Sequence, residues 1–464
     1  MSHPNILWIV LDACRADRVG CYGYHRDTSP NIDRLAAEGL RCDIAIAQGG
    51  YSLPSYATMF SGLYPSEHCV NDLSDTLGDD VPVIQELIKP LGYATAAIGG
   101  NGFFNDHFNL IRGFDVSHYH HPLSYRPEQG LAPRRGLTLR ARALRWLGYF
   151  GLIDHGMAHV CGLTRRYIAE HQSRPWLCFV HTMETHDPYV PPLGARLAMR
   201  DHWYALPTGP LAARHVSKAP RLRHSSPQAW HAHELLYDAE IRYSDAVLGG
   251  FLDRLKREGH LDNTLVVICA DHGDFMGERD HLRHGAGLGE GISRVPLILW
   301  GPEYVSPGSV ETQVVELRDI PHTLAALLDI EGLHVGERPA ANLLGTPRVP
   351  EGRLGFAERR ARAELRDMPH LWLGPNNAND RTQRLARDRA WEYIEYDNGE
   401  CNLFKVSEDP RETTNLCEAE PERAAKLHEE LVAIASTLQP RTTQVRDGDM
   451  PDEVQERLRD LGYL

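Results

Sequence analysis

The sequence lacks any hydrophobic run long enough to cross a lipid bilayer, which takes about 20 apolar residues in a helix. Its first apolar run, Ile6 to Leu11, ends at Asp12, and no later run reaches the required length. The four residues Met1-Ser2-His3-Pro4 carry no basic cluster of the kind that opens a secretory signal. We therefore expect neither a transmembrane segment nor a cleaved leader.

Regularly paired cysteines and an excess of basic charge are also missing. The nine cysteines are an odd number without paired spacing, which is typical of reduced thiols rather than of a disulfide framework. With no leader expected, this predicts a cytoplasmic location. The formal net charge of −14 argues against a general nucleic-acid-binding protein.

What the chain does contain is an alternation of apolar strand patterns and amphipathic helix patterns, typical of an α/β fold with a largely parallel sheet between helices. Strands are expected at residues 5–11, 93–99, 176–181, 264–270 and 295–300. Helices are expected after Ser52 and at residues 29–39, 81–91, 231–256 and 319–328.

The composition changes after about residue 345. Residues 391–396 alternate as in a half-buried antiparallel strand, residues 403–406 could pair with them, and residues 421–437 read as a helix. We therefore divide the chain into a catalytic α/β domain, 1–345, and a smaller α+β subdomain, 346–464, that closes one side of a cleft.

Two segments, about 120–165 and 190–228, interrupt the alternation as insertions. Arginines are concentrated between residues 126 and 150, and residues 196–223 are also basic. One interpretation is a pair of solvated insertions. The other is a lid or oligomer arm whose positive charge draws an anionic substrate toward the site. The oligomeric state is left open.

Acidic residues follow two of the buried strands. Asp12 comes directly after residues 5–11, and Asp271-His272 follows residues 264–270. Ligands of open α/β sheets bind at the carboxyl ends of the strands, so these side chains are placed for chemistry. The alternative for Asp12 is a capping role in the next turn.

A hydroxyl group precedes one of the expected helices. In Gly49-Gly50-Tyr51-Ser52-Leu53-Pro54, two glycines and a proline in the first helical turn bracket Ser52. Unpaired N–H groups at a helix N-terminus favour negative charge, so Ser52 is a candidate nucleophile. An ordinary helix N-cap is the other interpretation.

Asp12, Asp271 and His272 supply oxygen and nitrogen ligands suited to one divalent cation, and Ser52 could add its oxygen. The ligand types permit Ca²⁺, Mg²⁺, Mn²⁺ or Zn²⁺. A bound cation would lower the pKa of the serine hydroxyl and polarise an anionic electrophile.

Five stretches, in order, resemble the sulfatase family within the alkaline phosphatase superfamily. They are residues 5–12, 52–65, 271–273, 294–298 and 402–416. The resemblance implies a mixed sheet between helices and one metal held by Asp12, Asp271, His272 and Ser52. It also implies contacts of His186 and His284 with the substrate or leaving group, and oxyanion contacts of Asn71 and Asn101.

The chain departs from the family pattern at three positions. Tyr56 stands where relatives that convert the nucleophile to formylglycine carry Arg, which argues against that modification of Ser52. His284 stands where many relatives have Lys, and Ala13 follows Asp12 where many have a second acid. An unmodified serine needs water to attack its covalent intermediate, which favours phosphate esters.

These observations predict a metal-dependent hydrolase of small anionic sulfate or phosphate esters, in which Ser52 attacks and His186 or His284 protonates the leaving group. Two alternatives remain open. The first is a phosphodiesterase or phosphonate monoester hydrolase that uses an unmodified Ser52. The second is a non-catalytic family member that binds an anion in the same cleft.

Overall fold

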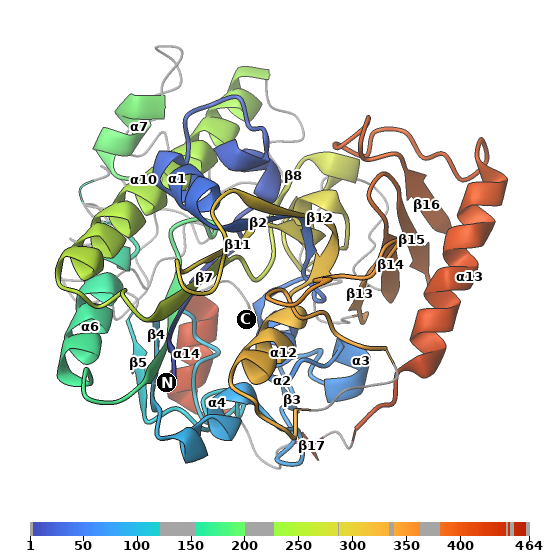
Figure 1. Ribbon diagram of the computed structural model, residues 1–464. Coiled ribbons are helices and arrows are strands. Elements are labelled where there is room, and N and C mark those ends of the chain that lie inside the picture. Colours follow the sequence, from blue (N-terminus) through green and yellow to red (C-terminus); the bar gives the residue numbers. More distant parts are fainter. Residues whose placement is uncertain are drawn as a thin grey trace.

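The computed structural model describes residues 3–120, 152, 154–199, 227–285, 287–333, 338–361, 381–441, 444–445 and 450–460. The strands of its main sheet are β1 (Asn5–Leu11), β2 (Leu40–Ile46), β4 (Ala94–Gly99), β5 (Val116–Tyr119), β6 (Trp176–Thr182), β7 (Thr264–Cys269), β10 (Arg294–Val295), β11 (Leu297–Trp300) and β12 (Ser309–Glu316). Their order is β10-β2-β11-β7-β1-β6-β4-β5, with β12 on β2 (Figure 1).

Strand β1 lies at the centre of this sheet, between β6 and β7, and runs parallel to both. Val10 lies opposite His181 on one side and Cys269 on the other, so the three strands end at the same edge. Strands β10 and β11 run antiparallel to β2, which makes the sheet mixed. The expected mixed, largely parallel sheet is confirmed.

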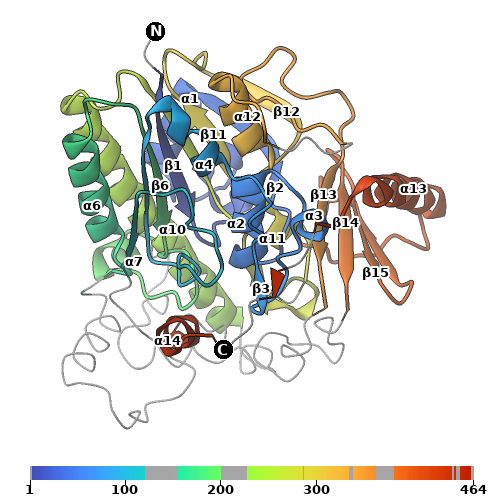
Figure 2. The same cartoon turned by 90° about the horizontal axis from the view of Figure 1, so that it is seen from below.

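Helices cover both faces of the sheet (Figure 2). Helices α1 (Pro30–Glu38), α6 (Met157–Glu170) and α10 (Pro227–Arg257) lie on one face, and α2 (Ser52–Ser61), α4 (Ile84–Leu87) and α12 (Asp319–Leu327) lie on the other. The central strands are therefore buried on both sides, which explains why their sequences are continuous apolar runs.

A second, antiparallel sheet contains β13 (Gly355–Arg359), β14 (Gln383–Arg387), β15 (Glu392–Tyr396) and β16 (Cys401–Phe404), with α13 (Pro421–Thr437) packed on β14 and β15. Tyr393 pairs with Leu403, so the expected pairing is confirmed. The chain then returns to the main body, where β17 (Gln444–Val445) pairs with β3 (Asp75–Thr76). Helix α14 (Asp452–Asp460) adds Leu458 to the main core. The division at residue 345 stays a prediction.

Two expected elements were wrong in extent, and prolines explain both. Residues 81–91 form only α4 and the 3₁₀ turn η3 (Lys89–Leu91), because Pro82 and Pro90 lack the N–H that a continuous helix needs. Residues 295–300 divide into β10 and β11 at Pro296. The arginine-rich residues 126–150 and the basic residues 200–223 lie outside the described part of the chain, so both interpretations of them stay predictions.

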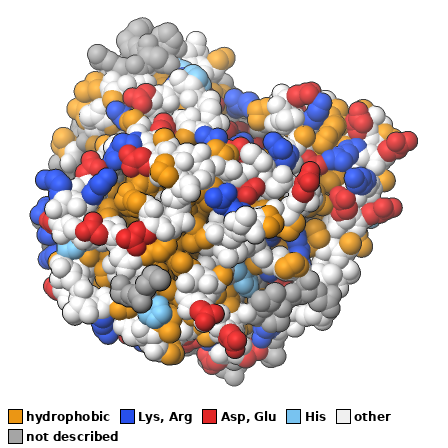
Figure 3. Space-filling model, viewed as in Figure 1, with side chains coloured by type: hydrophobic (Ala, Val, Ile, Leu, Met, Phe, Trp, Pro, Cys, Tyr) orange, Lys and Arg blue, Asp and Glu red, His pale blue; other side chains and the backbone are white. Residues whose placement is uncertain are grey.

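Seen as in Figure 1, the surface is hollowed between the main body and the C-terminal sheet, and basic and acidic side chains border the hollow (Figure 3). Among the described residues, no helix has the length and apolar character needed to span a membrane.

Candidate active site

Three side chains at the ends of the central strands converge. Asp12 follows β1, His181 lies near the end of β6, and Asp271 follows β7. Their ligand atoms lie within 4.8 Å of one another, and Nε2 of His181 is 3.0 Å from Oδ2 of Asp12. All three are fully buried. The parallel register of β1, β6 and β7 therefore builds one compact group of donors from distant parts of the chain.

This group fits a divalent cation. Oδ1 of Asp12 and Oδ2 of Asp271 are buried and have no hydrogen-bond partner in the part of the chain that the structure describes. A buried carboxylate oxygen without a partner is costly, and a cation would satisfy both oxygens at once. Two carboxylates and one or two imidazoles suit Mn²⁺ or Zn²⁺, and the oxygens also suit Ca²⁺ or Mg²⁺.

Ser52 and His272 face the same group. Oγ of Ser52 is 3.1 Å from Nε2 of His272. Nε2 of His272 lies 3.5 Å from Oδ2 of Asp271 and 3.6 Å from Oδ1 of Asp12. Nδ1 of His272 is 2.9 Å from the Gly273 carbonyl, which can only accept, so Nδ1 carries the proton. The lone pair of Nε2 is left for a metal.

The local sequence explains the position of Ser52. It is the first residue of α2, and Tyr51 before it is extended. A Cβ atom on Gly49 would lie 2.7 Å from the Pro54 side chain, so the turn needs a glycine there. The free N–H groups of the first helical turn add positive potential beside the serine oxygen.

The two carboxylates of the group have opposite pKa shifts. Burial, reinforced by the neighbouring charge of Asp271, raises the pKa of Asp12 well above its usual value. Burial also acts to raise the pKa of Asp271, but His272 and His181 outweigh it and hold that pKa below its usual value. Two buried acids this close do not both ionise easily without a cation between them.

His284 belongs to a neighbouring group with Asp274 and His272. Nδ1 of His284 is 2.6 Å from Oδ1 of Asp274, whose Oδ2 accepts a hydrogen bond of 2.6 Å from the Tyr189 hydroxyl. Nε2 of His272 already faces Asp12 and Asp271, so its lone pair cannot also bind a cation between Asp274 and His284. The arrangement therefore favours a hydrogen-bonded Asp–His pair over a second metal site.

His186 lies beside His284, with 4.7 Å between the ring centroids. Its Nδ1 is 2.6 Å from the Asp187 carbonyl, so this nitrogen also carries a proton. The rings of His284 and His272 are 4.4 Å apart. The three imidazoles thus form a continuous row that begins at Ser52.

The two asparagines are placed differently. Asn101 donates from Nδ2 to Oδ2 of Asp12 over 3.1 Å and to the Tyr56 hydroxyl over 3.3 Å. Asn71 donates from Nδ2 to the Pro65 carbonyl, and the backbone carbonyl of Asn71 accepts a hydrogen bond from the Tyr51 hydroxyl. Asn101 therefore touches a candidate metal ligand, whereas Asn71 supports the turn before Ser52. Oxyanion contacts of either residue stay predictions.

Sequence reasoning missed His181 and Asp274. His181 was assigned only to a strand, although it ends a buried strand as Asp12 does, and that position was a usable signal. Asp274 follows Asp271-His272-Gly273 closely, but its contact with His284 depends on a turn that no local pattern predicts.

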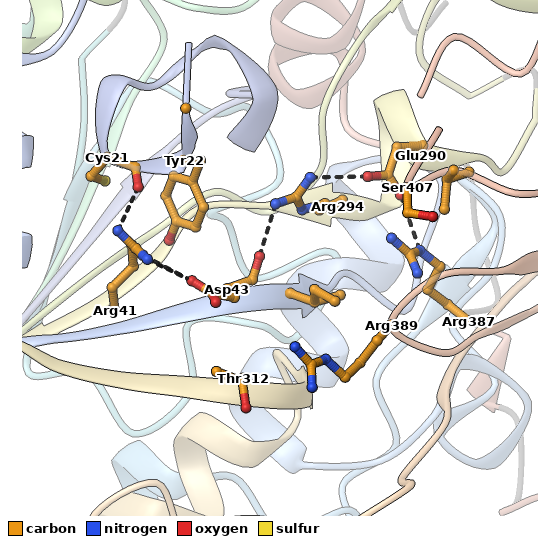
Figure 4. Close-up of a pocket in the computed structure, with 13 residues that line it drawn as sticks. Cys21, Tyr22, Arg41, Asp43, Glu290, Arg294, Thr312, Arg387, Arg389 and Ser407 are labelled. Atoms are coloured by element: carbon orange, nitrogen blue, oxygen red, sulfur yellow. Dashed lines mark hydrogen bonds and ion pairs between the residues drawn. The ribbon is translucent and has the colours of Figure 1, made fainter. Parts of the chain in front are cut away.

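A separate pocket of about 470 Å³ lies where β2 and β10 meet the C-terminal sheet (Figure 4). Arg41 binds Asp43, and Glu290 binds both Arg294 and Arg387. None of the residues that line the pocket belongs to the group around Ser52. The two pairs of Glu290 connect Arg294 of β10 with Arg387 of β14, whereas the pair of Arg41 and Asp43 lies within β2.

The structure thus places a buried serine at a helix N-terminus, beside two carboxylates and two imidazoles, at the carboxyl edge of an α/β sheet. The sulfatase family model matches residues 4–330, so this chain belongs to the sulfatase family.

Similar proteins agree with this membership. An uncharacterized sulfatase of Escherichia coli, YidJ, is 26% identical over 375 residues, which are 76% of this chain and 72% of that protein. The N-acetylglucosamine-6-O-sulfatase of Bacteroides thetaiotaomicron is 24% identical over 517 residues, with 97% of this chain and 88% of that protein covered.

The crystal structure of the phosphonate monoester hydrolase of Agrobacterium radiobacter has the same fold, with a TM-score of 0.71. It is 20% identical in sequence, and the superposition covers 96% of this chain and 97% of that one. The alkaline-phosphatase-like fold expected from the sequence is confirmed.

Proposed function

We propose that this protein is a metal-dependent hydrolase of sulfate or phosphate esters, with Ser52 as the nucleophile. The observation that carries the proposal is the position of the Ser52 hydroxyl, 3.1 Å from Nε2 of His272, which itself lies 3.5 Å from Oδ2 of Asp271. Membership of the sulfatase family supports it. A divalent cation held by Asp12, Asp271, His272 and Ser52 would lower the pKa of the hydroxyl and polarise the ester oxygens.

The residues around the serine have separate tasks. His272, whose Nε2 is 3.1 Å from Oγ of Ser52, helps to fix the position of the serine oxygen. The N-terminus of α2 stabilises negative charge on the group that Ser52 attacks. Asn101 donates a hydrogen bond to Asp12 and holds its carboxylate in place, and His181, 3.0 Å from the same carboxylate, is a further candidate ligand of the cation.

We assign the protonation of the leaving group to His284 rather than to His186. Nδ1 of His284 donates to the carboxylate of Asp274, which stabilises a charged imidazole ring. Nδ1 of His186 donates to the backbone carbonyl of Asp187, and burial together with His284 lowers the pKa of His186 well below its usual value. His186 is then a neutral partner for an oxygen of the substrate.

Ser52 acts in this proposal as an unmodified serine. Tyr56, which stands where formylglycine-forming relatives carry Arg, is buried against Phe104 and His181. Peptide mass spectrometry across residues 42–72 is expected to find the mass of serine at position 52. The mass of an aldehyde there would show that Ser52 is converted to formylglycine. The product would then be released by elimination rather than by attack of water, which would favour sulfate esters.

The activity test compares the wild type with Ser52→Ala on four probes: an aryl sulfate, an aryl phosphate monoester, an aryl phosphodiester and an aryl phosphonate monoester. Ser55→Ala is the matched control, because Ser55 is equally buried one turn away and its hydroxyl has no hydrogen-bond partner in the described chain. We expect Ser52→Ala to lose at least about 10³-fold in kcat. Equal turnover by both serine variants on every probe would remove Ser52 from the mechanism.

The same panel separates the alternatives. A clear preference for the diester or the phosphonate would select a phosphodiesterase or phosphonate monoester hydrolase, a class to which one solved structure of the same fold belongs. Failure to bind any divalent cation supplied in excess, together with no turnover, would favour a non-catalytic anion-binding protein.

A further inference from the structure

Two of the nine cysteines have their thiols in contact. Sγ of Cys401, the first residue of β16, lies 2.6 Å from Sγ of Cys417. Both side chains are partly exposed, and both are present as free thiols. A covalent S–S bond is about 2.05 Å long, so the two sulfurs need only a small approach to bond. Sequence spacing gave no sign of this pair, because 15 residues separate the two cysteines.

The backbone already holds the two cysteines together. Leu416 donates its N–H to the Leu403 carbonyl over 2.8 Å, and Leu403 donates its own N–H to Oδ1 of Asn415 over 3.0 Å. Asn415 also donates from Nδ2 to the carbonyl of Cys401. The ends of the segment between the cysteines are thus close together before any sulfur bond forms, so the bond needs little rearrangement of the backbone. It would stabilise the folded protein mainly by restricting the unfolded chain and the opening of this segment.

We propose that Cys401 and Cys417 are a site of reversible disulfide formation, with a small-molecule disulfide such as glutathione disulfide as the oxidant. One cysteine thiolate attacks a sulfur of glutathione disulfide, forms a mixed disulfide and releases one glutathione thiolate. The second cysteine thiolate then attacks the protein sulfur of that mixed disulfide and displaces the second glutathione. The protein loses two protons and two electrons, and glutathione disulfide takes up the electrons as two thiols.

The segment that this bond would close contacts two residues that lie on either side of His284 in the sequence. The carboxylate of Glu412 accepts a hydrogen bond from the N–H of Glu290 and pairs with Arg279. Arg279 and Glu290 stand before and after His284 in the chain. The disulfide would therefore constrain the loop of residues 401–417. Through Glu412, this loop contacts Arg279 and Glu290, and His284 lies between those two residues in the sequence. This inference does not depend on the proposed function.

The test is a peptide map of the full-length wild-type protein after equilibration in glutathione buffers from reduced to oxidised. Free thiols are alkylated before digestion, and the map is run without reductant. Trypsin cuts after Lys405 and Arg411, so the two cysteines fall in separate peptides. We expect these peptides to be joined in oxidising buffer and to separate on reduction. Alkylated Cys401 and Cys417 across the whole range would overturn the proposal.

Two variants complete the design. Cys417→Ser should abolish the cross-link and leave Cys401 either alkylated or as the mixed disulfide with glutathione, whereas Cys21→Ser, which removes another partly exposed cysteine, should keep the cross-link. The oxidised wild type should also melt a few degrees higher than the reduced protein and resist cleavage after Arg411. A cross-linked protein with an unchanged melting temperature and unchanged cleavage would overturn the claim that the bond fastens this loop.

Discussion

Nδ1 of His284 lies 2.6 Å from Oδ1 of Asp274, and both side chains are buried beside the serine site. An imidazole has two nitrogens that compete for its proton, and the carboxylate decides the competition by fixing the proton on Nδ1. Asp274 and His284 therefore form one hydrogen-bonded pair.

The first prediction concerns this pair. Asp274→Asn should lower kcat about 10- to 100-fold with little change in KM. The amide has no negative charge to stabilise a charged His284, and its NH₂ group can face Nδ1, so the imidazole ring would no longer be held in one orientation and tautomer. Tyr189→Phe removes only the hydroxyl that supports Oδ2 of Asp274 and should have a smaller effect in the same direction. Steady-state kinetics on the best aryl ester measures both. A wild-type kcat in Asp274→Asn would show that the pair has no role in turnover.

The second prediction concerns His181 as a metal ligand. His181→Gln should weaken divalent-metal binding about 10- to 100-fold, and Asp12→Asn should weaken it more. His155→Gln is the control, because burial lowers the pKa of His155 to about 4, as it does for His181, but His155 lies 3.8 Å from Glu240, which is outside the metal group. Calorimetric titration with Mn²⁺ or Zn²⁺ measures the affinity. If His181→Gln binds the cation with unchanged affinity, His181 is not a metal ligand.

The third prediction tests the close packing behind the metal loop. A Cβ atom on Gly273 would lie 2.2 Å from the Gly291 carbonyl oxygen, so Gly273→Ala must shift the loop that carries Asp271 and His272. We expect a loss of about 1–3 kcal/mol in the free energy of unfolding and weaker metal binding.

Gly162→Ala is the control for this substitution. Gly162 lies within α6, and a Cβ atom added to it would meet no atom of another described residue beyond its own helix within 4 Å. Alanine there should be neutral or stabilise the helix by up to about 1 kcal/mol. Denaturant unfolding of both variants gives the comparison. Equal stability of the two alanine variants would contradict the packing argument.

The fourth prediction concerns stability and pH at His68. Burial lowers the pKa of His68 to about 3, and its Nδ1 accepts the N–H of Val70 over 3.0 Å, which leaves no place for a second proton. Between pH 6.5 and 3 the unfolded chain binds this proton and the folded chain does not. The free energy of unfolding is therefore largest above pH 6.5 and falls as the pH is lowered.

His68→Gln should reduce the slope of that fall by about 1.4 kcal/mol per pH unit, the contribution of one proton. His118→Gln, at an exposed histidine, should leave the slope unchanged. Unfolding curves at several values between pH 4.5 and 6.5 provide the measurement. Identical slopes in all three proteins would mean that His68 takes up its proton in the folded state.

The sequence predicted the elements whose signals are local. The apolar run of β1 and the acid that follows it reflect a strand buried on both faces, and the glycines and Pro54 around Ser52 reflect the steric needs of one turn. The extents of the elements at residues 81–91 and 295–300 were harder to predict. In each, a proline without an N–H interrupts the backbone hydrogen bonds, although the pattern of apolar and polar residues continues across it.

By itself, then, the sequence determined that acidic residues follow two of the central strands and that Ser52 stands at the start of a helix. At these positions a few neighbouring residues decide burial and backbone conformation. Only the tertiary structure decided that His181 joins Asp12, that Asp274 holds His284, and that the thiols of Cys401 and Cys417 meet. Those contacts depend on the order of the strands and the paths of the turns between them. Both are set by the packing of the whole chain and leave no mark at a fixed sequence spacing.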